Sequence, residues 1–333
     1  MITLRDKTYE NVRLIFHEDE HKYNDTDGND YISVTTILGN YKTKFDKEYW
    51  LRRKAKELRI SVKELEKQWE TIKNEACERG TNTHNNLEDN IKLSSMFKKA
   101  VKYMIKENGE MITVADIPNI DMNVRQLDIK EFIDNTENKY PEIYKLFNYY
   151  TERDYKIYSE IGMFLPKWRI SGTIDILCLR EDSCIIGDWK TNRGGLKFTA
   201  GYYKKDKSTK PAQTTNIWVP KSEFLLPPLN NLPACNGSVY NMQLSLYAFG
   251  VEWILGIPCR GMWLCHIDSD FELNKYGMPK RFEDGLYHIK ENPIEKCTIH
   301  PMKYLREEVL GILKDRETVL QAENVTKELN LFD

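Results

Sequence analysis

The pattern of hydrophobic and polar positions changes near residue 155, from helical spacing to strand-like runs. Residues 46–59 and 61–89 repeat apolar positions at the helical period. Residues 155–164, 169–179 and 184–191 are instead dense in Ile, Leu, Tyr and Trp, which is typical of buried β-strands. The chain is therefore predicted to place a helical region before a sheet.

Local sequence signals define the other helices. Ser61 is a predicted N-cap, and Glu64 completes a capping box. Further helices are predicted over Met96–Glu107, Asp128–Asn135 and Pro141–Arg153, where proline opens the last one.

The order of elements after residue 155 predicts how the sheet is connected. The first three strands are expected to pair as an antiparallel meander. A loop over 192–236 follows, then a helix from Asn236 to Leu255 and a strand over Arg260–Ile267. That helix would cross to a fourth strand lying parallel to its neighbour, with a C-terminal helix at 301–323. The predicted fold class is α/β, a central mixed sheet flanked by helices.

The N-terminal segment predicts a β-hairpin. Val12–Phe16 and Tyr31–Val34 flank the turn-rich segment Asn24–Asp30. With no repeat and no strong linker, we expect one elaborated domain over residues 1–333. Its parts are a hairpin segment (1–45), a helical region with a helical insertion (46–154), a core (155–267) and a C-terminal hairpin and helix (268–333).

Composition narrows the class of protein. The chain of 333 residues is 41% hydrophobic and 30% charged, as in soluble globular proteins. No apolar run has the length of a membrane span, so we expect no membrane partner. Seven cysteines without paired CxxC spacing suggest reduced thiols and a cytoplasmic location. A net charge of −2 argues against a protein that coats nucleic acid non-specifically.

Two of the predicted strands carry buried charges. Alternation along a strand places Asp188 and Lys190 on one face and Trp189 on the other. Asp175, on the preceding strand, can lie alongside them. Buried charges are costly unless they are paired or bind a metal, so the residues leave an ion pair and a metal site open.

Weaker candidates lie on neighbouring elements. His84 and Glu88 are four residues apart and share a helix face, as do Gln243 and Tyr247. Taken alone, residue pairs of this kind more often lie on the surface or flank an amphipathic core than form a functional site. Glu160 could add a carboxylate to the cluster or be an ordinary exposed strand residue.

Basic segments suggest contacts with a phosphate backbone. Residues 42–59 hold eight Lys or Arg against three acids, interleaved with aromatic residues. A solvated amphipathic helix explains this pattern equally well. A second basic run at 202–210 is predicted to be a flexible loop near the acids. The candidate nucleic-acid contacts are Lys42, Lys44, Arg52, Arg53, Lys204 and Lys205.

Two short motifs imitate metal sites. His17–His21 matches the zinc-protease pattern HExxH, which requires a helix, but it follows a strand-like run and leads into a turn. Asp25–Gly28 resembles a calcium loop, but its glycine has the wrong offset and no Glu completes it. We interpret both as parts of the N-terminal hairpin. Neither a Walker A loop nor a GxGxxG motif is present.

Taken together, the candidates resemble the PD-(D/E)XK nuclease superfamily, specifically its RecB-like exonuclease branch. The matching residues follow the family order from 79 to 267: Gly80, His84, Glu88, Glu160, Gly172-Thr-Ile-Asp175, Asp188-Trp-Lys190-Thr191 and Gln243-Leu-Ser-Leu-Tyr247. Residues 21–38 are similar to the N-terminal segment of phage exonucleases and of the mitochondrial genome maintenance exonuclease. The resemblance implies a restriction-endonuclease-like sheet.

The resemblance also implies roles for these residues. Asp175 and Asp188 would bind Mg²⁺ or Mn²⁺, with His84 and the Trp189 carbonyl completing the site. Lys190 would orient the attacking water or neutralise the scissile phosphate, and its pKa should be lowered if it acts as the base. Gln243 and Tyr247 would steady Lys190 or hold a phosphate. Glu160 and Glu88 would support the metal. Cysteine spacing departs from that of the relatives with iron–sulfur clusters, so no cluster is expected.

The function expected from the resemblance is a standalone metal-dependent DNA exonuclease acting on single strands or free ends. Its partners would be DNA and proteins of phage replication, recombination or the virion. The alternative is a catalytically idle nucleic-acid-binding or virion-associated protein with the same fold, and the intact Asp175, Asp188 and Lys190 argue against it.

Overall fold

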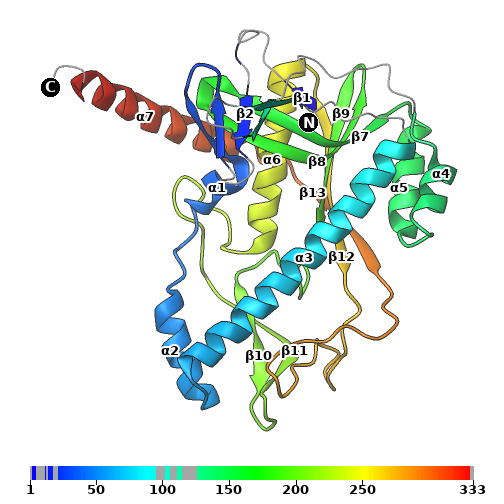
Figure 1. Ribbon diagram of the computed structural model, residues 1–333, viewed down its shortest axis with the longest axis vertical. Coiled ribbons are helices and arrows are strands. Elements are labelled where there is room, and N and C mark those ends of the chain that lie inside the picture. The colour runs from blue at the N-terminus through cyan, green and yellow to red at the C-terminus, as the bar shows by residue number, and fades with distance from the viewer. Residues whose placement is uncertain are drawn as a thin grey trace.

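A mixed β-sheet forms the centre of the chain, and helices cover both of its faces (Figure 1). The computed structural model describes residues 2–4, 12, 14–17, 22–94, 102–105, 111–114 and 126–330. Strands β7 (Lys156–Leu165), β8 (Ile170–Arg180) and β9 (Ser183–Lys190) pair antiparallel. Helix α6 (Asn236–Leu255) then leads to β12 (Cys259–Asp268), which runs parallel to β9. The predicted meander and crossover are confirmed.

Other strands extend the sheet at both ends, except β10 and β11, which form a separate two-stranded sheet. The other helices are α1 (Val34–Gly39), α2 (Lys47–Leu58), α3 (Val62–Ser94), α4 (Ile129–Asn135), α5 (Pro141–Thr151), the 3₁₀ turn η2 (Pro166–Trp168) and α7 (Arg306–Asn330). The other strands are β1 (Ile2–Leu4), β2 (Leu14–His17), β3 (Lys22–Asp25), β4 (Asp30–Ser33), β5 (Lys102–Ile105), β6 (Met111–Val114), β10 (Gly201–Asp206), β11 (Gln213–Pro220) and β13 (Lys296–Met302).

Each face of the sheet buries its own hydrophobic core. One core joins the sheet to α1, α6 and α7, and the other joins it to α3, α4 and α5. Trp189 lies in the second core, with its ring 5.3 Å from that of Trp263 and 6.2 Å from that of Phe147. Its neighbours Asp188 and Lys190 point to the α6 side, as the alternation predicts.

The alternation of side chains between the two faces of the sheet is broken at one place, on β7 and β8. Tyr158 and Ile161, three residues apart on β7, both face the α6 core, as do Ile174 and Leu177 on β8. Between them stands Glu160, whose φ of 57° is left-handed. Because a left-handed residue turns the strand, the adjoining side chains leave the regular face of the sheet.

The N-terminal hairpin is more elaborate than predicted. Three strands, β2, β3 and β4, form an antiparallel meander in place of two. Asp25 sets the turn between β3 and β4, because its Oδ1 accepts hydrogen bonds from the amides of Asp27 and Asn29. These hydrogen bonds hold a short turn between Asp25 and Asp30, so the predicted turn-rich segment Asn24–Asp30 is in part strand.

Short strands replace part of the predicted helical insertion. The helix expected over 96–107 is wrong, because Lys102–Ile105 is strand β5, paired with β6. The aromatic and β-branched residues of these segments favour pairing with a strand. The rest of 96–107 lies outside the described residues.

The long loop predicted over 192–236 is also wrong in part, because it contains the antiparallel ribbon β10–β11. Aromatic and β-branched residues such as Tyr203, Thr215 and Trp218 form the ribbon between lysine-rich ends. Tyr276 donates a hydrogen bond to Asp206 over 2.8 Å, and Gln213 donates one to the Arg281 carbonyl over 2.7 Å. The ribbon is therefore held by the segment 269–295.

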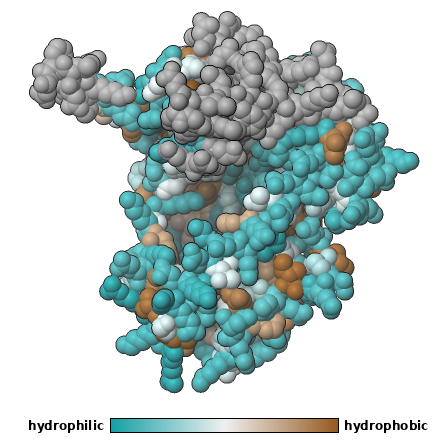
Figure 2. Space-filling view, in the orientation of Figure 1, coloured by the Kyte–Doolittle hydropathy of each residue, from teal (hydrophilic) through white to brown (hydrophobic). Residues whose placement is uncertain are grey.

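A second lobe is built from α2, the N-terminal half of α3, the ribbon β10–β11 and the segment 269–295, which we call the ribbon lobe. Arg281 donates to Gln68 of α3 over 3.1 Å, and Lys207 of the loop after β10 lies 3.6 Å from Glu57 of α2. Figure 2 shows a largely hydrophilic lobe, with a hollow between it and the sheet region.

The C-terminal region begins as a hairpin, because β13 pairs antiparallel with β12. Helix α7 starts later than predicted, at Arg306, and extends away from the sheet at its far end (Figure 1). Of the helices in the described parts of the chain, none is both long and apolar enough to pass through a membrane.

The HExxH match is not a zinc motif. His17 ends strand β2, and its Nε2 lies 2.7 Å from Oδ1 of Asn24 on β3. A strand cannot present two histidines at helical spacing. The four residues that follow His17 lie outside the described residues.

Candidate metal centre

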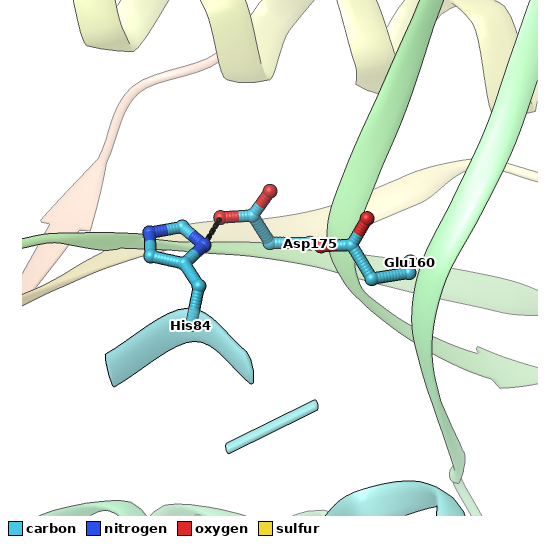
Figure 3. Close-up of side chains that lie close together, drawn as sticks. All are labelled: His84, Glu160 and Asp175. Carbon is cyan, nitrogen blue, oxygen red and sulfur yellow. Dashed lines mark ion pairs between the residues drawn. The ribbon is translucent and has the colours of Figure 1, made fainter. Parts of the chain in front are cut away.

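Three potential metal ligands converge where α3 crosses the sheet. His84 comes from α3, Glu160 from β7 and Asp175 from β8 (Figure 3). One ligand atom of each lies within 4.8 Å of the other two. His84 Nδ1 is 3.5 Å from Asp175 Oδ2. Among the described residues this is the one group of three or more His, Cys, Asp or Glu that is so close.

A glycine lets α3 approach the sheet at this point. A Cβ on Gly80 would lie 3.1 Å from the Thr191 Oγ1, just beyond the end of β9. Gly80 precedes His84 by one helical turn, so the close approach brings the imidazole over the strands. Burial lowers the pKa of His84, and Lys190 lowers it further, while Asp188 and a backbone hydrogen bond with Trp189 oppose this effect. A neutral imidazole is the form that binds a metal.

The two carboxylates of the cluster face each other across neighbouring strands. Ser159 pairs with Ile176 and Ile161 with Ile174, so Glu160 stands opposite Asp175. Glu160 keeps its left-handed conformation although it is not glycine. Such backbone strain is concentrated at functional sites, where the surrounding structure imposes it.

Asp188 and Lys190 form a buried ion pair beside this cluster. Lys190 Nζ lies 2.5 Å from Asp188 Oδ1, and the Asp188 side chain is 1% exposed. Burial and the charge of Asp175 raise the pKa of Asp188 to about 7, against the effect of Lys190. The other oxygen, Asp188 Oδ2, is buried without a hydrogen-bond partner. A buried oxygen without a partner is costly, which fits an oxygen that awaits a cation.

Lys190 is held as an ammonium. Burial lowers its pKa, but Asp188 and Asp175 outweigh this effect, so the pKa is raised. The lowered pKa that a general base requires is therefore not found, and the charge of Lys190 is suited to an anion.

Helix α6 covers the pair with the predicted Gln243 and Tyr247. Gln243 Nε2 is 3.5 Å from the Tyr247 hydroxyl, and a Cβ on Gly172 would lie 2.8 Å from Tyr247 Cε1. Burial, followed by Asp175 and Asp188, raises the pKa of Tyr247 well above its usual value. This hydroxyl therefore stays protonated and can donate a hydrogen bond.

Sequence reasoning did not single out Tyr240 as a site residue. Its ring lies 5.0 Å from Lys190 Nζ, within the range of a cation–π contact. It precedes Gln243 by three residues and Tyr247 by seven, which is the spacing of one helix face. That spacing could have identified it.

The other predicted members lie around the cluster with different partners. The Trp189 amide donates to Asp175 Oδ2 over 3.3 Å, so the backbone of Trp189 does border the centre. Glu88 forms an ion pair with Lys92 and is not part of the three-residue group. Glu160, which the sequence ranked behind Asp188, is the closer companion of His84 and Asp175.

The residues present fit a hard divalent cation. Carboxylate oxygens suit Mg²⁺, and an added imidazole suits Mn²⁺. His84, Glu160 and Asp175 are partly exposed, so an ion can reach them, and the Asp188 oxygen without a partner lies beside them.

The predicted basic contacts fall into three places. Lys42 and Lys44 are exposed on the connection between α1 and α2. Arg52 pairs with Glu48, and Arg53 donates to the Tyr49 hydroxyl, so both act within α2. Lys204 and Lys205 are exposed on β10, in the ribbon lobe. Arg52 and Arg53 also belong to the ribbon lobe, because Glu57 of α2 lies 3.6 Å from Lys207 after β10, whereas Lys42 and Lys44 precede α2.

Comparison of the chain with protein-family models, with curated proteins and with solved structures finds no match.

Proposed function

We propose that the protein is a divalent-metal-dependent nuclease of the PD-(D/E)XK type, in the RecB-like branch, which hydrolyses phosphodiester bonds of DNA. The observation that carries the proposal is the cluster of His84, Glu160 and Asp175 beside the Asp188–Lys190 pair. The sequence resembles that family through the same elements in the same order. A helix carries the histidine, a strand meander carries the two acids and the lysine, and a second helix follows.

The residues divide the chemistry between them. His84, Glu160, Asp175 and the partnerless oxygen of Asp188 would hold Mg²⁺ or Mn²⁺. When bound, the metal lowers the pKa of a water ligand and stabilises the charge that develops on the phosphate. Lys190, as an ammonium, neutralises the scissile phosphate. Tyr247 and Gln243 donate hydrogen bonds beside it, and Tyr240 restricts the lysine to this position.

A cleavage assay tests the proposal. A fluorescent single-stranded and a blunt duplex DNA are incubated with the protein in Mg²⁺, Mn²⁺ or EDTA. We expect shortening of at least one substrate with either metal and none in EDTA. Glu160→Gln and Lys190→Ala should each lower the rate by about a hundredfold or more.

Controls separate this proposal from the idle-protein alternative. Glu142→Gln, a half-exposed carboxylate on α5 outside the cluster, should cleave like the wild type. DNA binding without cleavage in every metal would support an idle binding protein and reject the nuclease. Cleavage that persists in Glu160→Gln and Lys190→Ala would place the catalytic site elsewhere.

A further inference from the structure

Cationic side chains gather in and beside the ribbon lobe, where Glu57 and Asp284 supply nearby acidic charge. Arg193 follows β9, Lys205 lies on β10, and Arg281 lies in the segment 269–295. None of the three is in an ion pair with a carboxylate in the described parts of the chain. Lysines elsewhere on the lobe, such as Lys54 and Lys207, do pair with Glu57.

The partners of the two arginines are neutral. The Arg193 guanidinium lies 3.5 Å from the centre of the Tyr287 ring, which orients the side chain and leaves its charge. Arg281 donates to the Gly285 carbonyl and to Gln68 Oε1, each over 3.1 Å. Both guanidiniums are therefore fixed in place while their charges remain available to an anion.

These side chains lie close to one another on the protein surface. Arg193 and Lys205 are exposed to solvent, yet desolvation by the surrounding protein lowers the pKa of both. The charges of Arg79 and Arg281 further lower the pKa of Arg193, and those of Arg281 and Lys54 that of Lys205. Arg281 pairs with Tyr287, whose ring Arg193 contacts, and the Arg281 amide donates to Gln213, the strand neighbour of Thr214, which pairs with Lys205. The three cations are therefore neighbours, and their charges repel one another until an anion binds.

Arg193, Arg281 and Lys205, which we call the cationic row, begin next to the candidate metal centre. Arg193 is three residues after Lys190, so their Cα atoms are at most about 10 Å apart. Arg79, one residue before the Gly80 contact with Thr191, adds a fourth cation, whose Nε is buried without a hydrogen-bond partner. Its ring contact is Phe271, 5.2 Å away, and Asp268, Glu75 and Glu295 supply acidic charge near it.

We infer that Arg193, Arg281 and Lys205 bind consecutive phosphates of a nucleic-acid strand and lead that strand between the ribbon lobe and the metal centre. The inference rests on the proposed function for the identity of the polyanion. A row of separated, oriented cations fits a repeating phosphate backbone, whereas a single small anion would engage one of them.

Binding in EDTA tests the inference without cleavage. The anisotropy of a fluorescein-labelled 20-nucleotide single strand is followed at several NaCl concentrations. We expect Arg193→Gln and Lys205→Gln each to weaken binding about five- to tenfold and to reduce the salt slope by about 0.7 per substitution. Arg193→Lys, which keeps the charge, should retain most of the affinity. Arg281 is left intact because it also joins the segment 269–295 to α3.

A matched control is available just after α5. The Arg153 guanidinium lies 3.6 Å from the Tyr149 ring centre and is exposed, so Arg153→Gln removes the same charge from a similar ring contact elsewhere. Arg153→Gln should bind like the wild type. If Arg193→Gln and Arg153→Gln show equal affinity and equal salt slope, the inference is overturned. Tighter binding of a labelled oligoglutamate than of the oligonucleotide would also overturn it.

The outcome is independent of the cleavage assay. Cleavage by a protein whose DNA binding does not depend on Arg193 or Lys205 would reject the role of the cationic row and leave the nuclease proposal standing. Binding that depends on these residues, without cleavage in any metal, would reject the proposed nuclease activity and leave the role of the cationic row standing.

Discussion

The strained backbone at Glu160 yields a stability prediction that separates conformation from charge. Glu160→Gly and Glu160→Ala both remove the carboxylate, and they differ in how well they adopt a φ of 57°. The left-handed conformation costs a residue with a Cβ about 1–2 kcal/mol. Glycine avoids that cost but loses about 0.5–1 kcal/mol through its greater freedom in the unfolded chain. We therefore expect Glu160→Gly to be more stable than Glu160→Ala by about 1 kcal/mol.

Urea denaturation in EDTA, followed by far-ultraviolet circular dichroism, measures this difference. Lys156 lies on the same strand without a positive φ, so there the order should reverse and Lys156→Ala should be more stable than Lys156→Gly. If Glu160→Ala is more stable than Glu160→Gly by about 0.5–1 kcal/mol, the order expected at Lys156, the conformation carries no cost and the strain argument fails. Both Glu160 variants should lose metal affinity equally, because both lack the ligand.

Three more predictions concern the surroundings of the centre. Gly187→Ala should destabilise the protein by about 1–3 kcal/mol in urea denaturation, because the new Cβ would lie on the Trp263 ring; unchanged stability would contradict the packing described. Tyr240→Leu should slow cleavage by about tenfold while Tyr240→Phe, which keeps the ring, cleaves like the wild type; equal rates would remove the ring from the site. Because the folded pKa of Asp188 is raised to about 7, its contribution to stability in EDTA is present at low pH and is lost as the pH rises from about 4 to about 7. Relative to Asp188→Asn, the wild type should therefore lose unfolding free energy across that interval, and parallel curves would refute the assignment.

The strand meander and the faces of its charged residues could be predicted from sequence. Strict alternation fixed the opposite directions of Asp188 and Trp189, because both cores are buried and a one-residue slip would bury the wrong side chains. The order of α3, β7, β8, β9 and α6 around the site followed from periodicity alone.

The left-handed turn at Glu160 could not be predicted, because Glu160 is not a glycine and stands in a run, with Tyr158 and Ile161, that favours a regular strand. The carboxylate that comes closest to His84 and Asp175 was therefore ranked too low. The ribbon β10–β11 was hidden for a different reason. Its strands are stabilised by contacts with residues 269–295, more than 60 residues away in the chain, such as that of Gln213 with Arg281.

Helix α3 acts as a rigid lever between the ribbon lobe and the metal centre. It is continuous over 33 residues and carries both Gln68, which is bonded to the lobe, and His84, about 24 Å further along its axis. A sharp kink in such a helix needs a specific cause such as a proline or a π-bulge, so a tilt of the lobe that moves α3 as a whole would also move the imidazole. If loading of the lobe tilts α3, loading and occupation of the centre would be linked through a single element, and by reciprocity each would change the affinity of the other by the same factor.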